Sequence, residues 1–366
     1  MSSPSSANPW QALLATEAGA GATLAVAYRV LHKHGRSWLL LPQEADLAQQ
    51  ALALYPAQSG KARFARAALR LCLSLGCAPG AERVDLRVET KLPFVQFLQK
   101  TAGTSGFPRL ASLAGNPATP GQRHILMLFD ESGSAPCVVK AGVGGRAMEL
   151  IGAEVKALRA FAGVPGVPSL RGEFETDWLR AFALDFCPGE SPSLDAEFAP
   201  YDLLTAWIQP QRKVSLIQLP ALRRLQELVT TKPELVALWK NLAEVEVHPA
   251  IVHGDFAPWN IKVAPRDGSW LVLDWERGER DGVPGWDWFH FVIQPELLVK
   301  RRKPEAIAQK LLTFLTSQPF QTYAAAAKIV GHERGLLCAY LAYFTQVVRP
   351  SEGCEAAEEL LRCLLR

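Results

Sequence analysis

The 366-residue sequence predicts an α+β protein with a small antiparallel-sheet lobe, a larger helical lobe and an N-terminal α/β extension. Between residues 105 and 187, three strand-like runs are followed by one helical segment and two more strand-like runs. Beyond residue 201, apolar residues recur at helical spacing, interrupted only at 251–285. We therefore expect an extension at 1–104, a small lobe at 105–187 and a large lobe at 188–366.

The composition is that of a folded chain with balanced charge. Hydrophobic residues make up 49% and charged residues 20% of the sequence, which is enough apolar material for a sizeable core. The formal net charge of +3 is too small for the electrostatic footprint of a dedicated nucleic-acid binder. The first hundred residues hold 11 Lys and Arg against 6 Asp and Glu, a net charge of +5, and the rest of the chain has a net charge of −2, so the chemistry downstream is not expected to use a basic patch.

The cysteines and the N-terminal residues predict a reducing, cytoplasmic setting. The seven cysteines are odd in number and include no Cys-x-x-Cys pair, so reduced thiols are expected instead of disulfides or a zinc cluster. The first residues lack the basic and apolar regions of a secretory signal. The apolar stretch at 20–31 contains Arg29 and is too short to span a bilayer.

The extension begins with a polar leader and then shows both strand and helix patterns. Two apolar runs, 23–31 and 37–41, flank a His-Lys-His-Gly-Arg segment and predict a strand pair. Helical spacing follows at 44–54 and 60–75, and 93–100 predicts one more short helix.

The predicted helix 60–75 is basic and amphipathic. It places three arginines (Arg63, Arg66 and Arg70) opposite three apolar residues (Phe64, Leu71 and Leu75). Such a helix can lie on an anionic membrane surface. We expect instead that it packs its apolar side on its own domain.

The two lobes follow from their element patterns. Strands of the small lobe are expected at 109–114, 122–130, 135–141, 169–174 and 179–186, with a helix at 148–162. Helices of the large lobe are expected at 201–208, 220–230, 234–246, 287–299, 304–316, 319–330, 332–348 and 353–365.

The non-helical insert of the large lobe concentrates the polar chemistry. Asp255 follows His253-Gly254 at the end of an apolar run, Asn260 lies five residues later, and Asp274 ends the next apolar run. An Asp and an Asn that converge are hard oxygen ligands of the type that Mg²⁺ uses. The remaining Asp255 can orient an attacking hydroxyl or accept its proton. Asp and Asn also favour simple turns, which explains each residue singly but not the ordered set.

This set resembles the aminoglycoside phosphotransferase and choline kinase family, small-molecule kinases of the protein-kinase-like fold. The motif residues are His253-Gly254-Asp255, Asn260 and Asp274-Trp275-Glu276. The resemblance covers residues 105–345 and implies a two-lobe kinase-like fold, with Asp255 as the catalytic residue. It also implies that Asn260 and Asp274 hold Mg²⁺ on the phosphates of ATP.

The resemblance implies nucleotide-binding residues upstream. Lys140, in the third strand of the small lobe, would hold the α/β-phosphates, and Glu154 on the following helix would brace it. Glu149 is the alternative partner, although its place at the helix start favours a dipole or capping role. Lys140 could also be an edge-strand charge. The resemblance places the backbone of Phe186 and Cys187 where the family binds the adenine ring of ATP.

Other residues carry less specific expectations. The first loop of the small lobe lacks the Gly-x-Gly-x-x-Gly motif, which leaves Asn116 and Thr119 as candidate phosphate contacts. His253 is expected to support the loop. Asp287 would either tie down the backbone of the catalytic loop or act as an N-terminal helix charge. Glu276 is a candidate for metal or acceptor contact. Four tryptophans (259, 275, 286 and 288) could line an acceptor pocket or belong to the core.

Together these observations predict an ATP- and Mg²⁺-dependent phosphotransferase. Its acceptor would be the hydroxyl of a small molecule such as a sugar, a sugar derivative, an aminoglycoside-like compound or an amino alcohol. The alternative is a kinase-like nucleotide-binding scaffold or regulator without turnover. A protein kinase is disfavoured, because only about a dozen residues separate Asp274 from Asp287, too few for an activation segment.

Overall fold

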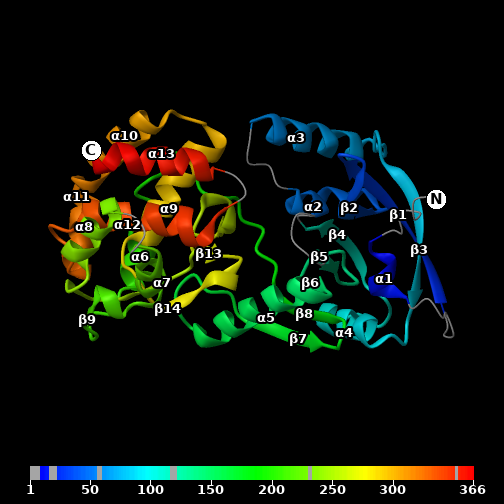
Figure 1. Cartoon of the computed structure of the whole chain (residues 1–366). Coiled ribbons are helices and arrows are strands. Elements are labelled where there is room, and N and C mark those ends of the chain that lie inside the picture. Colours follow the sequence, from blue (N-terminus) through cyan, green and yellow to red (C-terminus); the bar gives the residue numbers. More distant parts are fainter. Residues whose placement is uncertain (1–8, 16–22, 56–59, 116–121, 230–232, 351–352) are drawn as a thin grey trace, which may run out of the picture. The chain divides into compact units, whose positions relative to one another are not determined.

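The computed structural model describes residues 9–15, 23–55, 60–115, 122–229, 233–350 and 353–366 (Figure 1). The chain divides into two compact units. The first unit comprises Met1–Arg159 and Pro168–Pro188, and the second comprises Ala160–Val167 and Gly189–Arg366. No helix among the described residues is long and apolar enough to cross a membrane.

The first unit is built on one eight-stranded antiparallel sheet. The strand order is β3-β1-β2-β4-β5-β6-β8-β7. The strand bounds are β1 Thr23–Lys33, β2 Arg36–Pro42, β3 Glu82–Glu89, β4 Arg109–Ala114, β5 Gln122–Phe129, β6 Cys137–Val143, β7 Leu170–Glu175 and β8 Leu179–Asp185. The strands expected in the small lobe are all present, and α5 (Gly145–Ala160) is its expected helix.

The extension continues the sheet of the small lobe. β1 and β2 form the expected hairpin, and its turn places His34 at φ 53° and Gly35 at φ 72°, the left-handed backbone of a tight hairpin turn. β2 then pairs with β4 through Leu39–Leu113 and Leu40–Ser112. Residues 1–104 therefore share a compact unit with the strands that follow, and the boundary of that unit falls after Pro188.

Two elements of the extension were not expected from the sequence. β3 (Glu82–Glu89) pairs with β1 along its whole length, and α1 (Gln11–Leu14) lies within the polar leader. Leu86 and Val88 alternate toward the core, which is the period-2 pattern of a half-buried strand. Frequent charges in β3 mask this pattern in the sequence.

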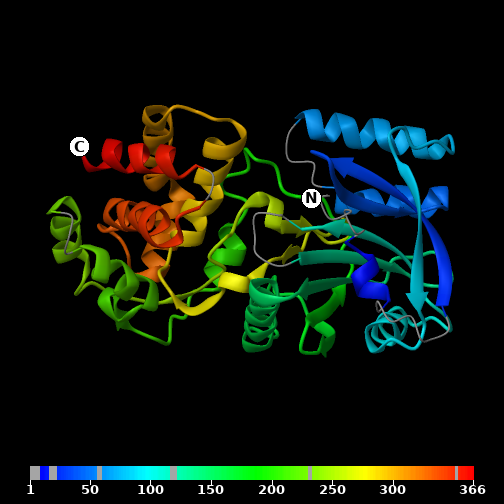
Figure 2. The ribbon, with the colours of Figure 1, turned by 45° about the vertical axis from the view of Figure 1, so that its right-hand side comes forward.

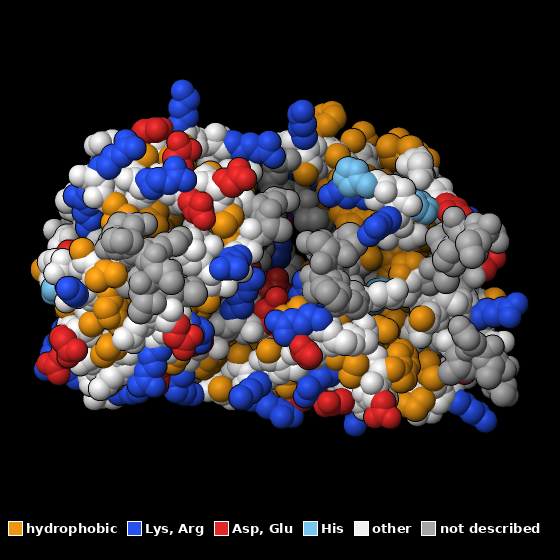
Figure 3. All heavy atoms as spheres, viewed as in Figure 1, with side chains coloured by type: hydrophobic (Ala, Val, Ile, Leu, Met, Phe, Trp, Pro, Cys, Tyr) orange, Lys and Arg blue, Asp and Glu red, His pale blue; other side chains and the backbone are white. Residues whose placement is uncertain are grey.

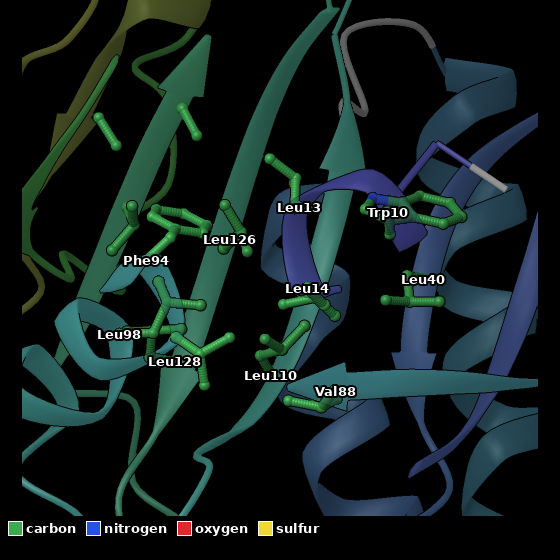
Figure 4. Packing of buried hydrophobic residues seen from close by; sticks show 14 of the residues in the cluster. Trp10, Leu13, Leu14, Leu40, Val88, Phe94, Leu98, Leu110, Leu126 and Leu128 are labelled. Carbon is green, nitrogen blue, oxygen red and sulfur yellow. The ribbon is translucent and has the colours of Figure 1, made fainter. Parts of the chain in front are cut away.

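Helices lie on both faces of the sheet (Figure 2), and each face has its own hydrophobic core. One face is covered by α1 and α4 (Pro93–Ala102), the other by α2 (Ala45–Ala51) and α3 (Gly60–Ser74). Figure 4 shows the first core, where Trp10, Leu13 and Leu14 enter among residues of the strands and α4. The indole N–H of Trp10 donates a hydrogen bond to the hydroxyl of Ser112 at 2.9 Å. The N-terminal segment is thereby fixed to the middle of the sheet.

Helix α3 is oriented differently from the prediction. Leu73 is fully buried, whereas Phe64, Leu71 and Leu75 are 77%, 63% and 75% exposed. Hydrophobic side chains are visible along the outer edge of α3 in Figure 3. The expectation that these three residues pack on their own domain is therefore wrong. The helix contacts α2, and the stripe that contains Leu73 joins the core that α2 and the strands share.

The second unit is mostly helical, as expected. Its helices are α6 Tyr201–Ala206, α7 Pro220–Val229, α8 Pro233–Leu242, α9 Trp286–Gln294, α10 Pro304–Leu315, α11 Gln318–Ala327, α12 Glu333–Tyr343 and α13 Cys354–Leu365. Five-residue π-helical turns extend α9 (Pro295–Val299) and α12 (Phe344–Val348). The prediction of an α+β fold with a sheet-based and a helical unit is confirmed.

Short strand pairs form the non-helical part of the second unit. Its strands are β9 Val214–Ser215, β10 Glu246–Val247, β11 Ala250–Val252, β12 Ile261–Val263, β13 Trp270–Val272 and β14 Glu279–Gly282. β11 pairs with β14 and β12 pairs with β13, both antiparallel. Both pairs leave polar loops at their ends, and these loops carry the motif residues.

Candidate active site

The loop that carries Asp255 begins where β11 ends. Gly254 adopts φ 79°, and a Cβ at this position would lie 2.9 Å from the Cβ and the carbonyl oxygen of Arg277. Only glycine fits this backbone and this close approach. The side chain of Asp255 follows and is 38% exposed, so its carboxylate is held at a loop but remains accessible.

His253 links the Asp255 loop to the strand that precedes Asp274. Its Nδ1 accepts the backbone N–H of Asp255 at 3.2 Å, and its Nε2 lies 2.7 Å from the carbonyl oxygen of Leu273. Because a carbonyl only accepts, Nε2 carries the proton, and the imidazole is neutral. Burial lowers the pKa of His253 to about 4, which keeps it neutral. These contacts fit the architectural role expected for His253.

Asp287 holds the backbone of the same loop. Its two carboxylate oxygens accept the N–H groups of His253 at 2.6 Å and Gly254 at 3.0 Å. Burial raises the pKa of Asp287 to about 6, although these two hydrogen bonds oppose the shift. Of the two roles considered for Asp287, the geometry favours the one that ties down the loop.

Asn260 contacts Asp255 directly. Its side-chain nitrogen donates to the carbonyl oxygen of Asp255 at 2.8 Å and to Oδ2 of the same residue at 3.0 Å. Because the amide nitrogen is engaged in this way, the amide oxygen is the atom of Asn260 that can act as a metal ligand. A one-turn 3₁₀ helix, Pro258–Asn260, sets the spacing between the two residues.

Asp274 occupies a left-handed backbone conformation, at φ 68° and ψ 51°. A non-glycine residue in this region is uncommon and points to a constrained site. The preceding Leu273 donates its N–H to the carbonyl oxygen of Asn260 at 2.7 Å. The structure therefore brings the backbones that carry Asn260 and Asp274 together within the second unit.

A buried histidine that the sequence analysis did not identify contacts Asp255. Nε2 of His290 lies 3.1 Å from Oδ1 of Asp255, and the His290 side chain is 4% exposed. Burial alone would raise the pKa of Asp255, but the hydrogen bond from His290 and the charge of Arg277 bring it below its ordinary value. The available signal was the position of His290 three residues after Asp287, on the same face of one helix.

Lys140 and Glu154 form an ion pair in the first unit. Nζ of Lys140 in β6 lies 2.6 Å from Oε1 of Glu154 in α5, and the two side chains are 10% and 2% exposed. Glu149 pairs instead with Arg146 at the exposed start of α5. The structure thus joins Lys140 with Glu154 and not with the alternative partner.

The remaining candidates have different environments. The backbone N–H of Phe186 donates to the carbonyl oxygen of Pro136 at 3.2 Å. Cys187 is partly exposed and lies next to the boundary between the two units at Pro188. The loop residues Asn116 and Thr119 lie outside the described residues.

The tryptophan cluster divides into core and partly exposed members. Trp275, Trp286 and Trp288 are buried, and each indole nitrogen donates to a backbone carbonyl. These three belong to the core. Trp259, beside Asn260, is only partly buried and remains a candidate for acceptor contact. Glu276 is also partly buried.

The donor set around Asn260 and Asp274 fits a magnesium ion. One carboxylate and one amide oxygen are hard ligands, and magnesium in phosphoryl-transfer sites takes few protein ligands. Among the described residues, no group of three or more His, Cys, Asp or Glu side chains could hold a metal ion. This is compatible with magnesium, because waters and substrate phosphates usually complete its coordination.

Comparison with known families supports the same chemistry. Residues 139–281 match the model of the phosphotransferase enzyme family, APH. This match covers less than half of the chain, so it shows a similarity of this segment to the family. The matched segment includes Lys140, Glu154, Asp255, Asn260 and Asp274, and it ends before His290.

Solved structures of other proteins resemble this chain at low identity. A thermostable mutant of the aminoglycoside phosphotransferase APH(4)-Ia is 15% identical, with 74% of this chain and 98% of that chain covered and a TM-score of 0.47. An ethanolamine kinase from Plasmodium vivax is 10% identical, with 70% of this chain and 82% of that chain covered and a TM-score of 0.46. A comparison with curated proteins found no match.

Proposed function

We propose that this protein is a phosphotransferase that moves the γ-phosphoryl group of ATP to a hydroxyl group of a small molecule. The observation that carries the proposal is the pair of hydrogen bonds from Asn260 to Asp255, on a loop whose backbone is fixed by His253 and Asp287. This loop presents an ionised carboxylate that is partly exposed. Phosphoryl transfer depends mainly on such positioning and on charge neutralisation.

In this proposal, Asp255 acts on the acceptor. Its carboxylate orients the acceptor hydroxyl and receives the proton. The acceptor oxygen forms a bond to the γ-phosphorus, the bond from that phosphorus to the bridging oxygen breaks, and ADP leaves. The low pKa of Asp255 keeps the carboxylate ionised, and therefore able to accept a hydrogen bond, at neutral pH.

The other candidates would bind the nucleotide. Asn260 and Asp274 would hold Mg²⁺, which when bound supplies positive charge to the phosphates. Lys140, held by Glu154, would contact the α/β-phosphates. The backbone near Phe186 and Cys187 would bind the adenine ring of ATP. The ternary complex of the APH(4)-Ia mutant with ADP and hygromycin B is a related case of nucleotide and small-molecule acceptor on one protein.

An acceptor screen tests the proposal. Sugars, sugar derivatives, aminoglycosides and amino alcohols are offered with ATP and Mg²⁺, and ATP consumption is measured. Wild-type protein should phosphorylate at least one acceptor, and EDTA should stop the reaction. Asp255→Asn should remove turnover but retain ATP binding. Asp267→Asn is the matched control, because Asp267 lies on the exposed turn between β12 and β13 and makes only local contacts.

The outcomes separate the proposal from its alternative. Turnover that survives EDTA would rule out the metal assignment. Turnover in Asp255→Asn equal to that of wild type would rule out the role of Asp255. ATP binding without turnover of any acceptor would favour the nucleotide-binding scaffold or regulator.

A further inference from the structure

One face of α9 contacts the catalytic loop at two points. Asp287 and His290 are three residues apart on this helix, so their side chains project from the same face. Asp287 binds the backbone N–H groups of His253 and Gly254, and His290 approaches the carboxylate of Asp255. The helix therefore contacts both the backbone of the loop and its reactive side chain.

The far side of the His290 ring is also held. The hydroxyl of Tyr340 in α12 lies 2.8 Å from Nδ1 of His290. The rings of Tyr340 and Phe344 meet the imidazole edge-to-face, with ring centroids 6.0 and 5.8 Å away. A ring that is enclosed in this way and has a polar contact at each nitrogen has little freedom to rotate.

The partners of His290 decide where its proton lies. Ionised Asp255 can only accept a hydrogen bond, so the contact of 3.1 Å requires a proton on Nε2 of His290. In the neutral ring, Nδ1 is then an acceptor and takes the hydroxyl proton of Tyr340. A hydrogen bond joins Tyr340 to His290, and an ion-pair contact joins His290 to Asp255.

We propose that His290 is a positioning residue for the phosphotransfer reaction. Its Nε2 contacts Oδ1 of Asp255 while Asn260 donates a hydrogen bond to Oδ2, and the two interactions together fix the plane of the carboxylate. This inference rests on the proposed function of Asp255. It adds a residue that lies outside the segment matched by the family model and that makes no contact with the acceptor in this scheme.

The expected effect is on kcat and not on ATP binding. Without the bond from His290, the carboxylate can rotate out of the orientation that the acceptor hydroxyl needs. Losses of supporting contacts of this kind typically reduce activity about 10- to 100-fold. Because the contact lies within the second unit and does not involve Lys140, the KM for ATP should stay close to the wild-type value.

Two substitutions at position 290 separate hydrogen bonding from packing. His290→Leu removes the donor, and kcat should fall about 10- to 100-fold. His290→Gln places an amide nitrogen near the position of Nε2 and should recover part of this loss. Tyr340→Phe removes the partner of Nδ1 and should cause a smaller decrease. His124→Gln, a buried histidine in the first unit, is the matched control and should keep wild-type kcat.

We would measure kcat only for variants whose folding has been checked by circular dichroism and by ATP binding. Wild-type kcat in His290→Leu would overturn the proposal. So would equal activity of His290→Gln and His290→Leu in well-folded proteins, because then a donor at this position does not matter.

A spectroscopic measurement separates this inference from the proposed function. Long-range ¹⁵N–¹H correlation spectra of ¹⁵N-histidine protein, assigned with His290→Gln, report which ring nitrogen carries the proton. A proton on Nε2 of His290 that is perturbed in Asp255→Asn supports the contact, even if no acceptor is turned over. A neutral ring with the proton only on Nδ1 would overturn the proposal regardless of activity.

Discussion

The side-chain amide of Asn260 donates to both the carbonyl oxygen and the carboxylate of Asp255, at 2.8 and 3.0 Å. The backbone oxygen of Asn260 also accepts the N–H of Leu273, the residue before Asp274. Asn260 is therefore connected to both acidic residues of the motif. Its side chain orients one of them, and its backbone locates the segment that carries the other.

Substitution of Asn260 should separate positioning from local folding. Asn260→Ala removes both side-chain bonds to Asp255 but keeps the backbone bond from Leu273. We expect kcat to fall at least about 100-fold, because both the orientation of Asp255 and an oxygen ligand are lost. Steady-state kinetics at saturating ATP test this. A decrease of less than about threefold would contradict the role given to Asn260.

The buried Lys140–Glu154 pair should be important for stability. Glu154→Gln removes the negative charge that contacts the buried Lys140 ammonium, which we expect to lower the free energy of unfolding by about 3 kcal/mol. Glu149→Gln, which breaks an exposed pair with Arg146 on the same helix, should change it by less than about 1 kcal/mol. Urea denaturation of both variants measures the difference. Equal effects would show that the Lys140–Glu154 pair is not buried in solution.

His124 should make the protein less stable in mild acid. It is 1% exposed in β5, neither ring nitrogen has a hydrogen-bond partner among the described residues, and burial lowers its pKa from 6.5 to about 4. Between these two pH values the unfolded chain binds a proton that the folded chain does not bind. The free energy of unfolding therefore falls as the pH drops from about 6.5 to about 4, by about 3 kcal/mol in total.

The variant His124→Leu isolates this effect. It removes the titrating group and fills the same apolar site. On going from pH 7.5 to pH 4.5, wild-type protein should lose about 3 kcal/mol more stability than the variant. Urea denaturation at both pH values measures this, and an equal loss in the two proteins would contradict the burial of His124.

The orientation of α3 can be tested with two leucines of the same helix. Leu73 is fully buried and Leu71 is 63% exposed. Leu73→Ala should lower the free energy of unfolding by about 2–5 kcal/mol, because it leaves a cavity beneath the helix. Leu71→Ala should change it by less than about 0.5 kcal/mol. The reverse order of the two effects would show that the helix packs through its other apolar stripe.

The sequence was most informative where a signal is local. Lys140 and Glu154 were paired correctly because a strand, a short turn and a helix place residues 14 positions apart with little freedom. The hairpin of β1 and β2 followed from two apolar runs around a short polar turn. The order of Asp255, Asn260 and Asp274 predicted a shared loop region, because short strands flank each residue.

Contacts between distant segments could not be predicted in the same way. The bond between His290 and Asp255 depends on how α9 lies against the loop, and the sequence pattern of α9 shows only a buried, apolar helix. The pairing of β2 with β4 depends on a contact across α2, α3, β3 and α4. Such contacts depend on tertiary packing, which sequence spacing does not predict.

The sequence by itself therefore determined the α+β class, most of the helices, the strands of the small lobe and the polar residues of the motif, because apolar periodicity and turn residues act over a few positions. The tertiary structure alone decided that the extension joins the sheet, which stripe of α3 is buried and which histidine contacts Asp255. Each of these depends on which distant surfaces bury the most apolar area together, and that choice is made by the whole chain.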